Sequence, residues 1–192
     1  MKIFNEVEKY IKLSDRDRIV LIQHLQLKKI KKGELISQQG QSNDFIGFVE
    51  NGLLRSYDLD ENGNDVTHHF FEEGSFFRDL SSYNQTENSY NKTEKFSVNI
   101  QALTDCELYI LDSDICEDLE NQIDGWTCMA LRYYQTKLTC LLNFHSKIKN
   151  YSSEDAFHTF SKYYKLAVKE SPKKHIASFL GMSKYTISRI RL

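Results

Sequence analysis

The side chains best suited to chemistry with a partner lie close together near the end of the chain. Ser183, Lys184, Tyr185, Thr186 and Arg189 bring hydroxyl, cationic and aromatic groups into one short segment. Arginine can form two hydrogen bonds with one guanine, whereas lysine and hydroxyl side chains suit phosphate oxygens. This combination indicates binding to double-stranded DNA.

Two short helices joined by a tight turn would position these residues. Ser171 can cap the first helix, and Pro172 fits its first turn, where a missing N–H has no cost. Gly181 permits the left-handed conformation that ends a helix. The apolar stripe of this first helix consists of Ile176, Ala177 and Leu180.

Ser183 can cap a second helix that buries Ile187 and Ile190. The pair then forms a helix-turn-helix, whose second helix enters the major groove of DNA. An ordinary helical hairpin is the alternative interpretation. The chain ends at Leu192, inside this expected second helix.

The distribution of charge supports DNA binding by the C-terminal part. Residues 150–192 contain eight Lys or Arg against three Asp or Glu, a net charge of +5. Residues 1–149 contain seventeen against twenty-four, a net charge of −7. A basic end on an acidic body is typical of a protein with a nucleic-acid-binding end, although a solvated basic helix face gives a weaker form of the same signal.

The composition also indicates where in the cell the protein is located. The first residues lack the apolar core of a signal peptide, and no segment approaches the ~20 apolar residues of a membrane span. We therefore expect a cytoplasmic protein that does not associate with membranes. The cysteines are too dispersed for a metal site or a disulfide framework, so we expect reduced, mostly buried thiols: Cys106, Cys116, Cys128 and Cys140.

The N-terminal part, residues 3–28, is predicted to be helical. Ser14 and Asp17 have the spacing of a capping box that opens a second helix. The apolar residues expected on that helix are Ile19, Ile22 and Leu25.

From Lys31 the pattern becomes that of an all-β sandwich or barrel. Glycines recur between short apolar runs such as FIGFVE and LLRSYDL, and strands resume at 97–102 and 107–111. Asn62-Gly63 predicts a hairpin with a type I′ turn. We expect residues 78–95 to form a loop.

Helical periodicity returns after Asp112. A short helix ends near Gln122, a long one covers 123–149, and another runs from Ser152 or Ser153 to about Val168. The long helix has two apolar stripes, one through Trp126, Tyr133 and Phe144 and the other through Leu131, Tyr134, Leu138 and Leu141/Leu142. A surface helix usually has one stripe, so two predict contact with the β-domain and with a second copy of the chain. The alternative is a helix buried wholly within one chain.

This order of elements resembles the Crp/Fnr family of bacterial transcription regulators. The most specific segments are VENGLLRSY at 49–57, EEGSFF at 72–77, LDSDICEDLE at 111–120 and HIASFLGMSKYTISRIR at 175–191. The resemblance implies an α+β protein. Its antiparallel β-roll, a jelly roll like that of cyclic nucleotide-binding domains, would have flanking helices.

The resemblance also implies a separate role for each of three parts of the chain. Residues 1–122 would form the sensor roll, 123–149 the dimerisation helix of a homodimer, and 150–192 the helix-turn-helix domain. The family's DNA-contacting positions fall on Lys184, Tyr185 and Arg189, with Ser183 and Thr186 near phosphates. RNA polymerase is a further partner that the family implies. Family members usually continue into a β-hairpin wing, which this chain lacks up to Leu192.

The ligand pocket departs from the family pattern. Nucleotide-binding members have a Gly-Glu pair at the start of a phosphate cassette and an Arg-Ser pair at its end. Here Arg78-Asp79 and Phe96-Ser97 take these positions. A cyclic phosphate needs an open approach to backbone N–H groups and a fixed cation. We therefore expect no physiological binding of cyclic AMP and predict no cofactor; the effector stays open.

Other chemistries have little support. No cysteine precedes Cys106, which argues against the N-terminal iron–sulfur cluster of oxygen-sensing relatives. Adjacent strand residues point to opposite faces, so His68 and His69 should not share a cupin-like metal site. No nucleophile–base pair or phosphate-binding loop occurs. The leading hypothesis is a non-enzymatic regulator; a sensor or interaction module with a vestigial DNA-binding tail is the alternative.

Overall fold

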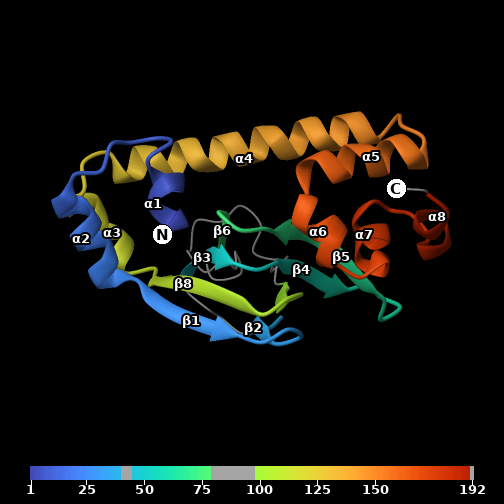
Figure 1. Cartoon of the computed structure of the whole chain (residues 1–192), viewed down its shortest axis with the longest axis horizontal. Coiled ribbons are helices and arrows are strands. Elements are labelled where there is room, and N and C mark those ends of the chain that lie inside the picture. The colour runs from blue at the N-terminus through green and yellow to red at the C-terminus, as the bar shows by residue number, and fades with distance from the viewer. Residues whose placement is uncertain (40–44, 79–97, 191–192) are drawn as a thin grey trace. The chain divides into compact units, whose positions relative to one another are not determined.

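The computed structural model describes residues 1–39, 45–78 and 98–190 (Figure 1). The chain forms two compact units. One is continuous, from His24 to Cys116, and contains all the strands. The other combines Met1–Gln23 with Glu117–Leu192 and is helical.

The continuous unit is a roll of two antiparallel four-stranded sheets, as the sequence predicts. One sheet has the strand order β1-β8-β3-β6 and the other β2-β7-β4-β5. Strands that are distant in sequence are therefore neighbours in both sheets. The strands are β1 (Gln26–Ile30), β2 (Leu35–Ser37), β3 (Phe45–Asn51), β4 (Leu54–Leu59), β5 (Asp65–Phe71), β6 (Phe76–Arg78), β7 (Asn99–Ala102) and β8 (Cys106–Asp112).

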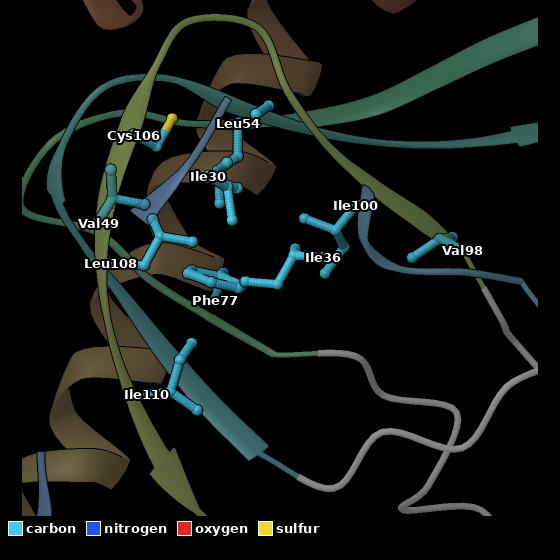
Figure 2. Packing of buried hydrophobic residues seen from close by; sticks show 11 residues of the cluster. Ile30, Ile36, Val49, Leu54, Phe77, Val98, Ile100, Cys106, Leu108 and Ile110 are labelled. Carbon is cyan, nitrogen blue, oxygen red and sulfur yellow. The ribbon is translucent and has the colours of Figure 1, made fainter. Parts of the chain in front are cut away.

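The core of the roll lies between the two sheets. In Figure 2, Ile36 and Ile100 of one sheet and Phe77 and Leu108 of the other point toward one another. Alternate residues of each strand supply this core, because successive strand side chains point to opposite faces. Burial of apolar side chains between the sheets is the main stabilising contribution in this unit.

The hairpin between β4 and β5 corrects one detail of the sequence prediction. Gly63 has a φ of +78°, but no described residue other than glycine has a positive φ, so Asn62 does not adopt the type I′ conformation. Gly63 N–H donates to the carbonyl of Asp60, and Asp60 N–H donates to that of Asn64. The loop is a turn of the type I class followed by a left-handed glycine, which is a common longer hairpin connection.

Helices form the other unit. The predicted capping box is confirmed, since Asp17 accepts from Ser14 N–H at 2.8 Å and Ser14 Oγ accepts from Asp17 N–H at 3.2 Å. The helical region predicted over 3–28 is too long, because the second helix ends at His24 and the chain enters β1 at Gln26. The helices are α1 (Lys2–Val7), α2 (Asp15–His24), α3 (Ile115–Gln122), α4 (Trp126–Ile148), α5 (Ser153–Tyr163), α6 (Lys165–Glu170), α7 (Lys173–Phe179) and α8 (Lys184–Arg189).

Three smaller expectations fail in the same helices. Helix α2 buries Val20 and Leu21, whereas Ile19 and Ile22 are exposed. The helix expected from 152 to 168 breaks at Tyr164, whose φ of −124° and ψ of 70° are not helical. Among the cysteines only Cys106 is buried, and Cys128 and Cys140 are exposed on α4.

Helix α4 has two unlike apolar faces. One face carries the buried residues Trp126, Met129, Tyr133 and Phe144. The other carries the predicted second stripe, in which Leu131 and Leu138 are 58% and 57% exposed. Tyr134 and Leu142 are exposed as well. A long helix with an uncovered apolar stripe is typical of an interaction face.

Aromatic rings join the end of α4 to the C-terminal helices within this unit. Phe144 stacks on Phe179 of α7 with ring centroids 5.6 Å apart. Phe160 and Tyr164 stack at 5.0 Å and also contact Phe179. Such ring contacts stabilise beyond simple burial, so α4, α5 and α7 are held together as one body.

Candidate nucleic-acid interface

A glycine turn connects α7 to α8. Gly181 has a φ of +65°. Its N–H donates to the carbonyl of Ser178 at 3.1 Å, and Met182 N–H donates to that of Ala177 at 2.8 Å. This pair of bonds is the Schellman motif, which satisfies the last carbonyls of α7. The predicted turn at Gly181 is therefore confirmed.

The start of α7 differs from the prediction. Pro172 takes the N-cap position, and Ser171 instead ends α6 in an extended conformation. The hydroxyl of Ser171 donates to the carbonyl of Pro172 at 3.3 Å and caps no N–H of α7. Ser171 is already the C-cap of α6, so the N-cap position of α7 falls on the next residue, Pro172.

Packing between α7 and α8 orients the second helix. The buried residues of α7 include Ile176, Ala177 and Phe179, and α8 buries Ile187, which is 1% exposed. The small side chain of Ala177 permits a close approach of two helices. Because α8 has one buried residue in its body, the opposite side of this short helix faces solvent.

The N-terminus of α8 is capped without a carboxylate. Ser183 Oγ accepts from Thr186 N–H at 3.1 Å and lies 2.9 Å from the Thr186 hydroxyl. At α5 the same cap position, Ser152, is paired with Asp155, and at α2 Ser14 is paired with Asp17. A threonine in place of an acid keeps negative charge away from the end of α8. That arrangement suits the approach of phosphate groups to Ser183 and Thr186.

Three side chains project from α8 into solvent. Lys184, Tyr185 and Arg189 are all exposed. Tyr185 and Arg189 are four residues apart and so lie one above the other on the helix side opposite Ile187. Lys184 Nζ lies 5.2 Å from the centroid of the Tyr185 ring. The predicted base-reading residues are thus brought to one outward surface.

The end of α8 corrects the expectation that the chain stops within a helix. The helix ends at Arg189, and Ile190 has extended angles, with φ −69° and ψ 121°. A helix of six residues has few internal hydrogen bonds, so it depends on its cap and on Ile187 for stability.

Sequence reasoning missed a buried polar cluster in the roll. Arg55 is 2% exposed, and its guanidinium donates to Asp65 at 2.5 and 2.6 Å. It also donates to Gln101 and to Thr67. These residues come from β4, β5 and β7, so only the strand pairing brings them together. The one sequence signal was an arginine that directly follows two leucines in the LLRSYDL run.

Comparison with known proteins identifies the roll. Residues 27–122 match the family model described as the cyclic nucleotide-binding domain. The chain belongs to the cyclic nucleotide-binding domain family. No curated protein matches the chain significantly.

Solved structures share this fold at low sequence identity. FixK2 from Bradyrhizobium japonicum is 14% identical, with a TM-score of 0.66 over 86% of this chain and 81% of that one. A Eubacterium rectale protein described as a Crp/Fnr-family transcriptional regulator is 18% identical, with a TM-score of 0.65 over 92% and 81%. The c-di-GMP-responsive global regulator CLP from Xanthomonas campestris is 14% identical, with a TM-score of 0.63 over 90% and 87%. The chain therefore shares the fold of these proteins over most of its length.

Aromatic rings occupy part of the interior of this cyclic nucleotide-binding domain. Phe77 packs against Phe45 and Phe71, with centroids 6.1 and 5.9 Å apart. Its ring also covers Gly47 so closely that a Cβ there would lie 2.1 Å from Phe77 Cζ. Rings thus occupy the space between the sheets beside the predicted pocket residue Arg78.

Arg78 itself is directed to another part of the domain. Its Nη2 donates to the hydroxyl of Ser113 at 3.0 Å. The other predicted pocket residues, Asp79, Phe96 and Ser97, lie outside the described residues. A cavity of about 340 Å³ has mainly apolar walls and one cation, and is lined by Gln26, Leu27, Lys28, Ile36, Phe45 and Ile110.

His68 and His69 do not follow the strict alternation expected of a strand, because β5 contains a β-bulge. His69 and Thr67 pair with consecutive residues of β4, which leaves His68 as the extra residue. His68 Nε2 lies 3.0 Å from Asp58 Oδ1, and the His69 ring contacts Phe71 at 4.9 Å. His69 pairs with Ser56 of β4. Asp58, which His68 contacts, is two residues farther along β4 and so lies on the same face as Ser56. Both histidines therefore lie on one face.

The shared face does not create a metal site. Within the described parts of the chain, no three or more His, Cys, Asp or Glu side chains are grouped to hold a metal ion. Among the helices of the same parts, none combines the length and apolarity that a membrane span requires.

Proposed function

We propose that this protein is a homodimeric, sequence-specific, DNA-binding transcription regulator of the Crp/Fnr type, without enzymatic activity. The observation that carries the proposal is the outward surface of α8. Its exposed Tyr185 and Arg189 lie opposite the buried Ile187, and the exposed Lys184 lies beside Tyr185, on a capped helix that follows a tight glycine turn. RNA polymerase is a further partner in this proposal.

The exposed stripe of α4 is the proposed dimer interface. Leu131, Tyr134, Leu138 and Leu142 would pack against the same residues of a second copy. Two α8 helices would then enter successive major grooves, about 34 Å apart, on a near-palindromic site. In this scheme 1–122 senses, 123–149 dimerises and 150–192 binds DNA.

Cyclic AMP is not the proposed effector. The rings of Phe45, Phe71 and Phe77 occupy space between the sheets beside Arg78, and Arg78 is bound to Ser113. The lysine-bearing cavity beside β1 offers room for a smaller molecule. Isothermal calorimetry with cyclic AMP should show no heat of binding at micromolar concentrations; tight binding would contradict this part of the proposal.

Selection of bound sequences from a random DNA pool, confirmed by gel shift, tests DNA binding and symmetry together. We expect a near-palindrome whose half-sites are one helical turn apart. The affinity should fall steeply with salt, because several phosphate contacts release counterions.

A Leu138→Glu variant tests the dimer. A buried charge in each copy of the interface should shift the protein to a monomer in sedimentation experiments and abolish binding to the full palindrome. Asn143→Glu adds the same charge to an exposed position on a different side of α4 and should leave the dimer intact. Equal behaviour of the two variants would exclude this face as the interface.

A sensor or interaction module with a vestigial DNA-binding tail is the second candidate. The short α8, with six residues, favours it, because so small a helix offers few contacts. Selection without any preferred sequence, together with weak salt dependence, would support this candidate over the first.

A further inference from the structure

Tyr185 has the largest exposed fraction among the exposed large apolar and aromatic side chains of the described residues, at 68%. It lies in the body of α8, on the helix side opposite Ile187. An aromatic ring that is displayed in this way contributes nothing to the core. The ring is therefore available to a partner surface that offers an apolar element.

Two neighbours define the surroundings of the ring. Lys184 Nζ lies 5.2 Å from the ring centroid, within the range of a cation–π contact that limits the motion of the ring. Arg189 is one turn farther along the same side, about 6 Å along the helix axis. Base pairs of DNA are stacked at about 3.4 Å, so two such residues reach bases roughly two pairs apart.

The apolar element of the major groove is the 5-methyl group of thymine. We infer that Tyr185 reads a thymine methyl with its ring, within about two base pairs of the guanine that Arg189 contacts. The inference rests on the proposed DNA-binding function and assigns the base chemistry of the same surface. The ring, and not the hydroxyl, makes the contact.

Uracil in place of thymine tests this contact, because it removes one methyl group and keeps every hydrogen-bonding group of the base. Each thymine of the selected operator is replaced in turn by deoxyuridine, and affinity is measured with the full chain. At one symmetric pair of positions we expect binding to weaken about fourfold per methyl, the ratio for burying one such group. Tyr185→Phe should retain this loss, whereas Tyr185→Ala should bind both operators equally.

Folding does not confound these variants, since Tyr185 is exposed; circular dichroism should show the same helix content in all three proteins. If no sequence is selected at all, the proposed function fails. If an operator is selected but no uracil weakens binding, or if Tyr185→Ala remains sensitive to uracil, this inference alone is overturned. Loss of the discrimination in Tyr185→Phe would instead assign the contact to the hydroxyl.

Discussion

Two arginines show how differently the two ends of this chain use the same side chain. Arg55 is buried in the roll, where Asp65, Gln101 and Thr67 accept from its guanidinium. Arg189 is exposed on α8, in the last turn of a helix that buries only Ile187. A guanidinium whose hydrogen bonds are satisfied inside the protein stabilises the fold, whereas an exposed one is available to a partner.

The same contrast separates the two units more generally. In the roll, the ring of Phe77 packs against those of Phe45 and Phe71 and covers Gly47. The C-terminal helices instead display Tyr185 and Lys184. The roll is therefore organised around internal contacts and the α8 surface around external ones.

The largest expected effect is that of Arg55→Ala on stability. The change leaves the carboxylate of Asp65 and the amide of Gln101 without their donor, at a cost of about 3 kcal/mol. This value is at the low end for a buried pair because the Asp65 side chain is 34% exposed. Urea denaturation measures the free energy of unfolding of the roll. Arg189→Ala is the matched control and should change that free energy by less than about 0.5 kcal/mol.

When DNA affinity is measured in place of stability, Arg189→Ala should have a larger effect than Arg55→Ala. Loss of a guanine contact weakens operator binding by about 1–3 kcal/mol and relaxes base preference at one position. Competition gel shifts with operators altered at that position provide the measurement. Lys184→Ala should weaken binding more evenly across sequences. An unchanged footprint for both variants would remove α8 from the interface.

Thr186, which pairs with the N-cap Ser183 of α8, offers a further test of this comparison. Thr186→Asp would give α8 the acidic partner that Ser14 and Ser152 have at α2 and α5. The helix should be as stable as before or more so, because an acid suits a helix N-terminus. The added charge should nevertheless weaken DNA binding by about 1 kcal/mol, since it faces phosphates. Thermal melting and gel shifts on one preparation separate the two effects.

The smallest expected effect concerns Asp17 at α2. The backbone N–H of Ser14, and then its hydroxyl, hold the pKa of this carboxyl below its usual value. A lowered pKa stabilises the fold above the unfolded pKa, and this contribution is lost as the pH falls through the folded pKa. Asp17→Asn should therefore cost less than about 1 kcal/mol at pH 7, and the difference should shrink toward pH 3.

Asp15→Asn is the control for this last measurement. It removes the same charge from the same turn of α2. A larger cost for Asp17→Asn isolates the hydrogen bonds with Ser14, whereas equal costs would mean that only the helix dipole is involved.

Local signals predicted the helix-turn-helix well. Gly181 ends α7 and Ser183 caps α8 because both effects depend on residues within one turn of the chain. The strand pattern of the roll was also predicted, from the short apolar runs between its glycines. The prediction of one helix from Ser152 or Ser153 to about Val168 failed, because the chain breaks at Tyr164, whose ring stacks on Phe160 and contacts Phe179, and helix periodicity does not encode such contacts.

The sequence by itself determined the order of elements, the glycine turn, the capping residues and the basic character of the C-terminal part, because each of these depends on near neighbours or on composition. Tertiary structure decided which polar residues are buried and which are displayed. The contact of Arg55 with Gln101 and the ring of Phe77 over Gly47 arise from pairing of strands that are distant in sequence, and the bulge that brings His68 and His69 to one face arises from the register of the β4–β5 hairpin. Pairing between distant strands cannot be read from local periodicity, since many registers bury the same apolar residues.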